Sequence, residues 1–184
     1  PIKWILAMML AGIVISVIGY TSLDHVKYRI DSFLSPETPV LQVRKSIEAY
    51  ESGGILGKGP GEGVVKTSIS DSHTDFIFPV IAEEYGLIAC LAIVSLIISI
   101  LIRGLFQTIK SKNIFVLIAS TGLLLQFGFQ AFINISVSLQ LAPVTGVTLP
   151  FISYGGSSLL SMGIGMGMML ALTRRPYGGR VIYE

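Results

Sequence analysis

Charged residues are distributed unevenly along this chain, and the long intervals between them are apolar. Residues 4–23, 85–102 and 113–173 contain no Asp, Glu, Lys or Arg. A helix that crosses a membrane needs roughly 20 apolar residues at a rise of about 1.5 Å each. The first two intervals therefore predict one crossing apiece. The third would be roughly 90 Å long as a single helix, so it must turn inside.

Two prolines and a glycine place that turn. Pro143, Gly146 and Pro150 lie near the middle of the third interval, and such residues interrupt helices and favour bends. No strand pattern occurs in the sequence, so we expect an all-α integral membrane protein. Its four spanning helices are predicted at about residues 4–23, 76–102, 113–140 and 152–173. The chain enters its first apolar segment almost at once after Pro1, which suggests a C-terminal piece of a larger multi-span protein.

The composition agrees with a membrane protein. Hydrophobic residues make up 52% of the chain and charged residues 13%, whereas soluble domains carry about a quarter charged residues. This deficit disfavours a soluble enzyme, a nucleic-acid-binding protein and a disordered tail. The single Cys90 cannot form an internal disulfide. The net charge of +2 is too small to indicate an electrostatic partner.

Basic residues predict the orientation of the helices in the membrane. The short connection at about 103–112 carries three basic residues and no acid, and the tail at 174–184 carries three arginines and one acid. Two crossings separate these segments, so both are expected on the same, cytoplasmic face. The long loop at about 24–75 then lies outside the cell membrane. It contains six basic and eight acidic residues.

One helix is predicted inside this outer loop. Thr38-Pro39 resembles a capped helix start, apolar residues follow at helical spacing from Val40 to Tyr50, and Gly53-Gly54 ends the pattern. An amphipathic helix on the membrane surface is favoured over a helix packed against the protein.

A glycine-rich segment at 53–63 follows this helix. Its glycines do not have the spacing of a phosphate-binding loop, because Ser52 and Gly59 occupy positions that need glycine and a hydroxyl residue. A dinucleotide fingerprint fails as well, at Glu62. The segment is more typical of a turn-rich stretch that lets the backbone approach a neighbour closely. We therefore expect no nucleotide or organic cofactor.

Carboxylates and a histidine cluster near the start of the second predicted span. Asp75 directly precedes an apolar helical run, so the simplest interpretation is a helix N-cap. The alternative is chemical: Asp75 could act as a general base. Glu83 and Glu84 could help to hold a divalent cation such as Mg²⁺ or Mn²⁺.

Polar residues also occur inside the later spans. Gln126, Gln130 and Asn134 recur every four residues and share one helical face. Hydrogen bonding between helices is the favoured interpretation, and a substrate path is the alternative. Ser153 and Ser157 do not form a hydrolase nucleophile, because no Gly-x-Ser-x-Gly motif surrounds them.

Five segments, in order along the chain, resemble motifs of the SEDS family, the bacterial shape, elongation, division and sporulation proteins. They are 57–61 (Gly-Lys-Gly-Pro-Gly), 73–78 (His-Thr-Asp-Phe-Ile-Phe), 82–86 (Ala-Glu-Glu-Tyr-Gly), 129–134 (Phe-Gln-Ala-Phe-Ile-Asn) and 143–158 (Pro-Val-Thr-Gly-Val-Thr-Leu-Pro-Phe-Ile-Ser-Tyr-Gly-Gly-Ser-Ser). The sequences of these motifs resemble the division members of the family more than the elongation members. Ser70 stands where the family usually has a proline.

This resemblance implies a fold and an activity. Family members have about ten spans with both termini in the cytoplasm, so this chain would supply the last four. They polymerise lipid II into peptidoglycan strands at the outer face of the bacterial cytoplasmic membrane, with a class B penicillin-binding protein as partner. A division member would work at the septum, with other division-complex membrane proteins and membrane lipids around it and no nucleic acid.

The resemblance also assigns residues. The essential aspartate of the His-Thr-Asp-Phe motif corresponds to Asp75, which would take the proton of the acceptor hydroxyl. Contacts to substrate are expected from the remaining polar residues of the motifs and their surroundings, namely His73, Thr74, Lys66, Lys58, Gln130, Asn134, Ser153 and Ser157.

Two other functions stay open from the residues alone. A transporter that flips the lipid-linked precursor would use the polar stripe at 126–134 and the broken connection at 143–150, although the ionisable residues lie at one mouth rather than at the midplane. A scaffold that only recruits division enzymes would not need Asp75.

Overall fold

The structure is a computed structural model that describes residues 2–35 and 41–174. All regular secondary structure in these two ranges is helical, as the sequence predicts. The predicted cap at Thr38 and most of the basic tail lie outside them. The elements are α1 (Ile2–Ser22), α2 (Asp24–Leu34), α3 (Leu41–Gly53), the short 3-10 helix η1 (Val65–Ser68), α4 (Ile77–Ile109), α5 (Ile114–Ser138) and α6 (Gly156–Thr173).

Four of these helices, α1, α4, α5 and α6, are long and apolar enough to cross a membrane. The prediction of an all-helical protein with four candidate spans is therefore confirmed. The largest differences in the bounds are in two places. Helix α4 continues to Ile109, and α6 begins only at Gly156 because residues 139–155 form an irregular connection that contains both prolines.

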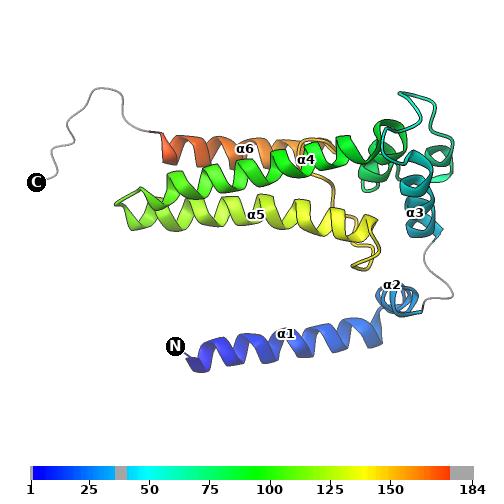
Figure 1. The fold of residues 1–184 in the computed structure, drawn as a ribbon. Coiled ribbons are helices and arrows are strands. Elements are labelled where there is room, and N and C mark those ends of the chain that lie inside the picture. The colour runs from blue at the N-terminus through cyan, green and yellow to red at the C-terminus, as the bar shows by residue number, and fades with distance from the viewer. Residues whose placement is uncertain (1, 36–40, 175–184) are drawn as a thin grey trace, which may run out of the picture.

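Three of the spans form a bundle. Figure 1 shows α4, α5 and α6 running alongside one another, and α5 packs against both of the others. Their shared core includes Ile97 from α4, Phe127 and Ala131 from α5, and Met162 from α6. At Gly104 the helices approach so closely that a Cβ atom would lie 2.6 Å from the Leu124 side chain.

Helix α1 has different surroundings. Figure 1 shows it apart from the other spans, and none of its residues is buried. Its contacts are mainly with α2, where the Tyr20 hydroxyl donates a hydrogen bond of 2.8 Å to Asp31 Oδ1. The residues of α1 itself are apolar on every side of the helix, which suits a helix in contact with lipid or with further membrane helices.

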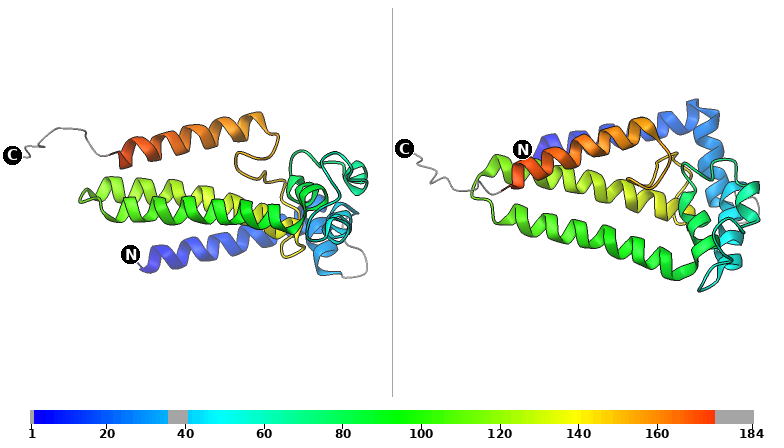
Figure 2. Two further views of the ribbon diagram at one scale, coloured as in Figure 1. Left: turned by 45° about the horizontal axis from the view of Figure 1, so that its top comes forward. Right: turned by 90° about the horizontal axis from the view of Figure 1, so that it is seen from above.

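The segments of the long loop gather at one end of the bundle (Figures 1 and 2). There α3 packs along the first turns of α4, and its inner face, with Val43, Ser46, Ala49 and Gly53, is buried. At Gly53 a Cβ atom would overlap the backbone of Ala82. The prediction of a helix on the membrane surface is wrong, because α3 buries this face against protein.

Helix α4 is broken at Gly86, whose φ of 77° and ψ of −176° are not helical. The glycine-rich segment fills the break: it donates backbone hydrogen bonds to the carbonyls left free and accepts from the freed amides. The predicted close backbone approach is thus observed, and α4 is the neighbour. The four bonds are Lys58 N to Glu83 O (2.9 Å), Gly59 N to Glu84 O (3.0 Å), Leu87 N to Gly54 O (3.0 Å) and Ile88 N to Ile55 O (3.4 Å).

Candidate functional site

The candidate site is a tight turn just before α4, at the loop end of the bundle. The backbone amides of Thr74 and Phe76 both donate to the carbonyl of Asp71, at 3.2 and 3.1 Å. Phe76 is fully buried and packs with Val43 and Val137. Because the neighbouring aromatic ring is anchored in this core, Asp75 is held at the surface of the turn.

Asp75 does not cap α4. The N-cap residue is Phe76, and no side chain bonds to the first amides of the helix. The expected capping role of Asp75 is therefore wrong. Within residues 2–35 and 41–174, no hydrogen-bond or ion-pair partner is found for the Asp75 carboxylate, which leaves its oxygens available for chemistry.

This turn is also bonded to α5 and to the connection between α5 and α6. Asn134 Nδ2 donates to the Asp75 carbonyl at 2.8 Å and to the Val147 carbonyl at 2.7 Å. The backbone amide of Tyr154 donates to the His73 carbonyl at 2.8 Å. Gly146, with φ of 75°, faces the carboxylate, because a Cβ atom there would be at van der Waals distance, 3.5 Å, from Asp75 Oδ2.

These surroundings raise the pKa of the Asp75 carboxyl above its ordinary value. Partial burial is the main cause, because it removes solvent from the charged form. The negative charge of Asp71 adds to the rise, and the positive charge of Arg29 opposes it. A carboxylate with a raised pKa is a stronger base, and a base works best when its pKa approaches the working pH.

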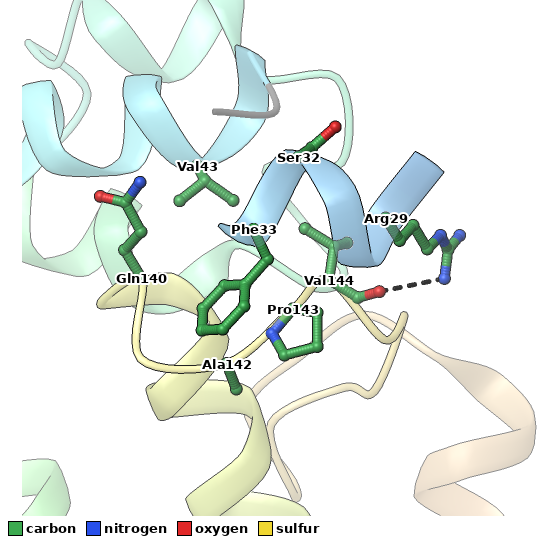
Figure 3. A pocket seen from close by; sticks show the side chains of 8 residues that line it. All are labelled: Arg29, Ser32, Phe33, Val43, Gln140, Ala142, Pro143 and Val144. Carbon is green, nitrogen blue, oxygen red and sulfur yellow. Dashed lines mark hydrogen bonds between the residues drawn. The ribbon is translucent and has the colours of Figure 1, made fainter. Parts of the chain in front are cut away.

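Arg29 belongs to α2, which lies over the α5–α6 connection. Figure 3 shows its guanidinium bonded to the carbonyl of Val144, with Nη1 donating at 3.1 Å. Sequence analysis missed Arg29 as a site residue, since 46 positions separate it from Asp75. The resemblance to the family also includes Tyr28-Arg29, and this was the one signal in the sequence that could have pointed to Arg29. A small cavity between α2 and the connection is lined by Arg29, Ser32, Phe33, Val43, Gln140, Ala142, Pro143 and Val144.

A second carboxylate, Glu83, is fully buried on α4. Its Oε1 accepts hydrogen bonds from the backbone amides of Val64 and Val65, at 2.8 and 2.9 Å, and its Oε2 accepts from the amide of Lys66 at 3.0 Å. The Ser52 hydroxyl adds a bond of 3.3 Å. Glu83 therefore fastens η1 and the end of the glycine-rich segment to α4.

The predicted cation site does not fit these residues. Both oxygens of Glu83 already accept hydrogen bonds, and Glu84 forms an ion pair with Lys66. Within the two described ranges, no three His, Cys, Asp or Glu side chains are grouped as metal ligands. No step of the chemistry is therefore assigned to a metal at Glu83 and Glu84.

The two predicted lysines share this arrangement. Lys66 Nζ pairs with Glu84, and Lys58 Nζ lies 3.8 Å from Glu83 Oε1. Sequence analysis expected both ammonium groups to face substrate, whereas the structure turns them toward these glutamates. They belong to the Glu83 cluster rather than to the turn that carries Asp75.

The remaining predicted residues fall into three places. His73 and Thr74 lie in the turn itself, with the His73 side chain exposed. Gln130 Nε2 donates to the Thr148 carbonyl and to Ser158 Oγ, both at 3.0 Å, which matches the favoured hydrogen-bonding interpretation of the polar stripe. Two serines complete the set: Ser153 Oγ accepts from the Leu149 amide at 2.8 Å, and Ser157 is exposed on α6.

Comparison with known proteins gives consistent matches over most of the chain. The model for cell cycle proteins of the FtsW, RodA and SpoVE type matches residues 1–177. The chain is 46% identical over 181 residues to "Probable peptidoglycan glycosyltransferase FtsW" of Caulobacter vibrioides, and 39% identical over 175 residues to the Bacillus subtilis protein of that name. It is 34% identical over 169 residues to "Peptidoglycan glycosyltransferase RodA" of Mycobacterium tuberculosis.

These matches cover 97%, 88% and 90% of this chain, but only 46%, 43% and 35% of the relatives. The chain thus spans less than half the length of each of these three proteins. A solved structure described as "Structural coordination of polymerization and crosslinking by a peptidoglycan synthase complex" superposes with a TM-score of 0.67 at 26% identity. That match covers 96% of this chain and 50% of the solved one.

Proposed function

Because this chain belongs to the family of cell cycle proteins that includes FtsW, RodA and SpoVE, we propose that its parent protein is a peptidoglycan glycosyltransferase. The proposed reaction polymerises lipid II into glycan strands for the septal wall of a dividing bacterium. Three of its similar relatives are named as peptidoglycan glycosyltransferases. Asp75 is the proposed general base.

In the proposed step, Asp75 accepts the proton of the 4-hydroxyl group of the acceptor GlcNAc. The oxygen attacks the anomeric carbon of the growing strand, and the bond from that carbon to the diphosphate oxygen breaks. Undecaprenyl diphosphate leaves with the bonding electrons, and the configuration at the carbon inverts. The protein then has to hold the base, the hydroxyl and the diphosphate in line.

One observation carries this proposal: at the loop end of the bundle, the Asp75 carboxylate is partly exposed and has no hydrogen-bond partner among the described residues. Its neighbour Glu83 is buried and saturated with hydrogen bonds, so it is a poor candidate for proton transfer. Partial burial raises the pKa of the Asp75 carboxyl above its ordinary value, which makes its carboxylate a stronger base.

The cation for the leaving diphosphate is proposed to be Arg29. Lys58 and Lys66 face glutamates, whereas the charge of Arg29 acts on Asp75. Its guanidinium uses one donor on Val144, and its fork geometry suits a second interaction with phosphate oxygens. His73 and Thr74, beside the base, are proposed to contact the sugar or the diphosphate.

The setting of the reaction follows from the charge pattern and from the family. The basic connection and tail favour a cytoplasmic location for one end of the bundle, so Asp75 would face the outside, where lipid-linked precursors are polymerised. The expected partner is a class B penicillin-binding protein with other division-complex membrane proteins. The structural relative is described as part of a peptidoglycan synthase complex, which supports a partner of this kind.

The test is a reconstitution of the full-length parent with its penicillin-binding partner and labelled lipid II. Polymer is expected from the wild type and not from Asp75→Asn. Equal polymer from both would overturn the role of Asp75. If neither forms polymer while lipid II still crosses the bilayer, the protein is a flippase; if neither activity occurs and the partner is still recruited, it is a scaffold.

A further inference from the structure

The side chain of Asn134 is unusual among the buried polar groups. Only 2% of the residue is exposed, yet its Oδ1 has no hydrogen-bond partner among the described residues. Its Nδ2 donates two short bonds, both to main-chain carbonyls. Carbonyl oxygens accept hydrogen bonds but cannot donate them. The side of the Asn134 amide that faces these two carbonyls must therefore be the –NH2 group, and this fixes the orientation of the amide.

The two carbonyls belong to segments that are far apart in sequence. One is that of Asp75, in the turn before α4; the other is that of Val147, in the connection between α5 and α6. A single –NH2 group on α5 therefore joins three parts of the chain. Asp75 O and Val147 O have no other tie to each other in the described structure, although Tyr154 fixes the nearby carbonyl of His73.

Val147 follows directly after Gly146, the residue that lies against the Asp75 carboxylate. The link through Asn134 thus bears on the distance between the Asp75 carboxylate and the backbone at Gly146. A displacement of about 1 Å at a reacting group can lower a rate by about 100-fold. The geometry at Asn134 is therefore suited to controlling the position of the base.

We propose that Asn134 is a positioning residue: its amide ties the backbone of Asp75 to that of Val147 and so holds the catalytic carboxylate against Gly146. This inference rests on the proposed function, since it assigns Asn134 to the geometry of the base. It replaces the sequence-based expectation that Asn134 contacts substrate. A substrate contact would involve Oδ1, whereas the observed contacts all involve Nδ2.

The experiment compares wild type and Asn134→Leu in the full-length protein with its partner, using two readouts. Steady-state polymerisation of lipid II gives kcat and KM. Hydrogen–deuterium exchange gives the opening of the turn, reported by the amides of Thr74 and Phe76, which bond to Asp71. Positioning predicts that kcat falls about 100-fold with KM within twofold of wild type, and that the turn exchanges about tenfold faster.

A matched control lies one helical turn away. Gln130 also binds the α5–α6 connection, at Thr148 and Ser158, but makes no bond to the turn that carries Asp75. Gln130→Leu should therefore speed exchange in the connection and leave exchange at residues 73–76 unchanged. If Gln130→Leu opens the turn as much as Asn134→Leu does, the specific link through Asn134 is overturned.

Other outcomes are equally decisive. A raised KM with unchanged kcat and unchanged exchange would make Asn134 a substrate contact and overturn the proposal, as would no change in any readout. If Asn134→Leu fails to fold, the shape-matched Asn134→Asp, which sets an acceptor against the carbonyls, is measured in the same way. If the wild type makes no polymer, the proposed function fails, and exchange at 73–76 alone still decides whether Asn134 positions the turn.

Discussion

Asp75 and Glu83 are two carboxylates eight residues apart, and they differ in burial and in hydrogen bonding. Glu83 is buried and accepts four hydrogen bonds, three of them from consecutive backbone amides. Asp75 is partly exposed, and the described residues offer its carboxylate no hydrogen bond. A carboxylate whose lone pairs are all engaged holds structure together, whereas one left without partners is available to accept a proton.

The difference arises from what each residue's neighbours do. The segment at 63–66 folds over Glu83, and a Cβ atom at Gly63 would lie 2.8 Å from Glu83 Oε2, so a side chain there would push the carboxylate away from these amides. Around Asp75 the hydrogen bonds are made to its backbone and not to its side chain. The backbone at Asp75 is thus held by a hydrogen bond, while the carboxylate has no hydrogen-bond partner among the described residues.

The largest expected effect is on activity, from Asp75→Asn. Loss of a general base should lower the polymerisation rate roughly 10²- to 10⁴-fold. Stability should not fall. The raised pKa means that the fold disfavours the charged form, so the stabilising contribution of Asp75 is present at low pH and is lost as the pH rises through its folded pKa. The check is an initial rate together with a thermal denaturation curve at neutral pH; a lower melting temperature would contradict this view of Asp75.

Glu83→Ala should show the reverse pattern. Removing the carboxylate leaves several buried amides without an acceptor, and we expect a loss of at least about 3 kcal/mol of stability. The measurement is thermal denaturation of the purified full-length protein, with exchange of the amides at 64–66 as the local readout. Glu83→Gln serves as the control for shape. An unchanged melting temperature with normal exchange in this segment would show that Glu83 is not the anchor.

A smaller effect is expected on the pH dependence. The rate should decline on acidification as Asp75 becomes protonated, at a pH above the ordinary range of an aspartate. Because the charge of Arg29 lowers the pKa of Asp75 and that of Asp71 raises it, Arg29→Gln should move this decline to higher pH and Asp71→Asn to lower pH. Rate profiles of the three proteins test it, and shifts in the same direction for both variants would refute it.

The smallest effect concerns the ion pair between Lys66 and Glu84. Both side chains are partly exposed, at 23% and 13%, and pairs near the surface contribute about 0–1 kcal/mol. Lys66→Met should therefore lower stability by less than about 1 kcal/mol, far less than Glu83→Ala. Parallel denaturation curves of the two variants make the comparison. A loss as large as that of Glu83→Ala would place the anchor in the ion pair instead.

Much of the fold was predictable from local pattern. The four candidate spans, the turn around Pro143 and Pro150, and the close backbone approach of the glycine-rich segment all follow from short stretches of sequence. The polar stripe was also correctly interpreted as hydrogen bonding, at Gln130. Each of these features depends on residues near one another in the chain, so propensity and hydropathy are sufficient to find them.

The errors share a different origin. Helix α3 was expected on the membrane surface because its pattern is amphipathic, but the partner that covers its apolar face is α4. Asp75 was expected to cap α4, because it precedes an apolar helix, yet the turn around Asp71 places Phe76 at the cap. No local pattern indicated either that the folded loop brings Lys58 and Lys66, which were expected to contact substrate, to Glu83 and Glu84.

The sequence by itself determined that this chain is helical with four candidate membrane spans, because the transfer of apolar residues into a bilayer is nearly a sum over neighbours in sequence. Which carboxylate is bonded and which is free was decided only by the tertiary structure. That distinction depends on amides and carbonyls contributed by distant segments, at 52, 63–66, 134 and 146–147. No local pattern predicts which of these segments come into contact, because the contacts form only when distant parts of the chain pack together.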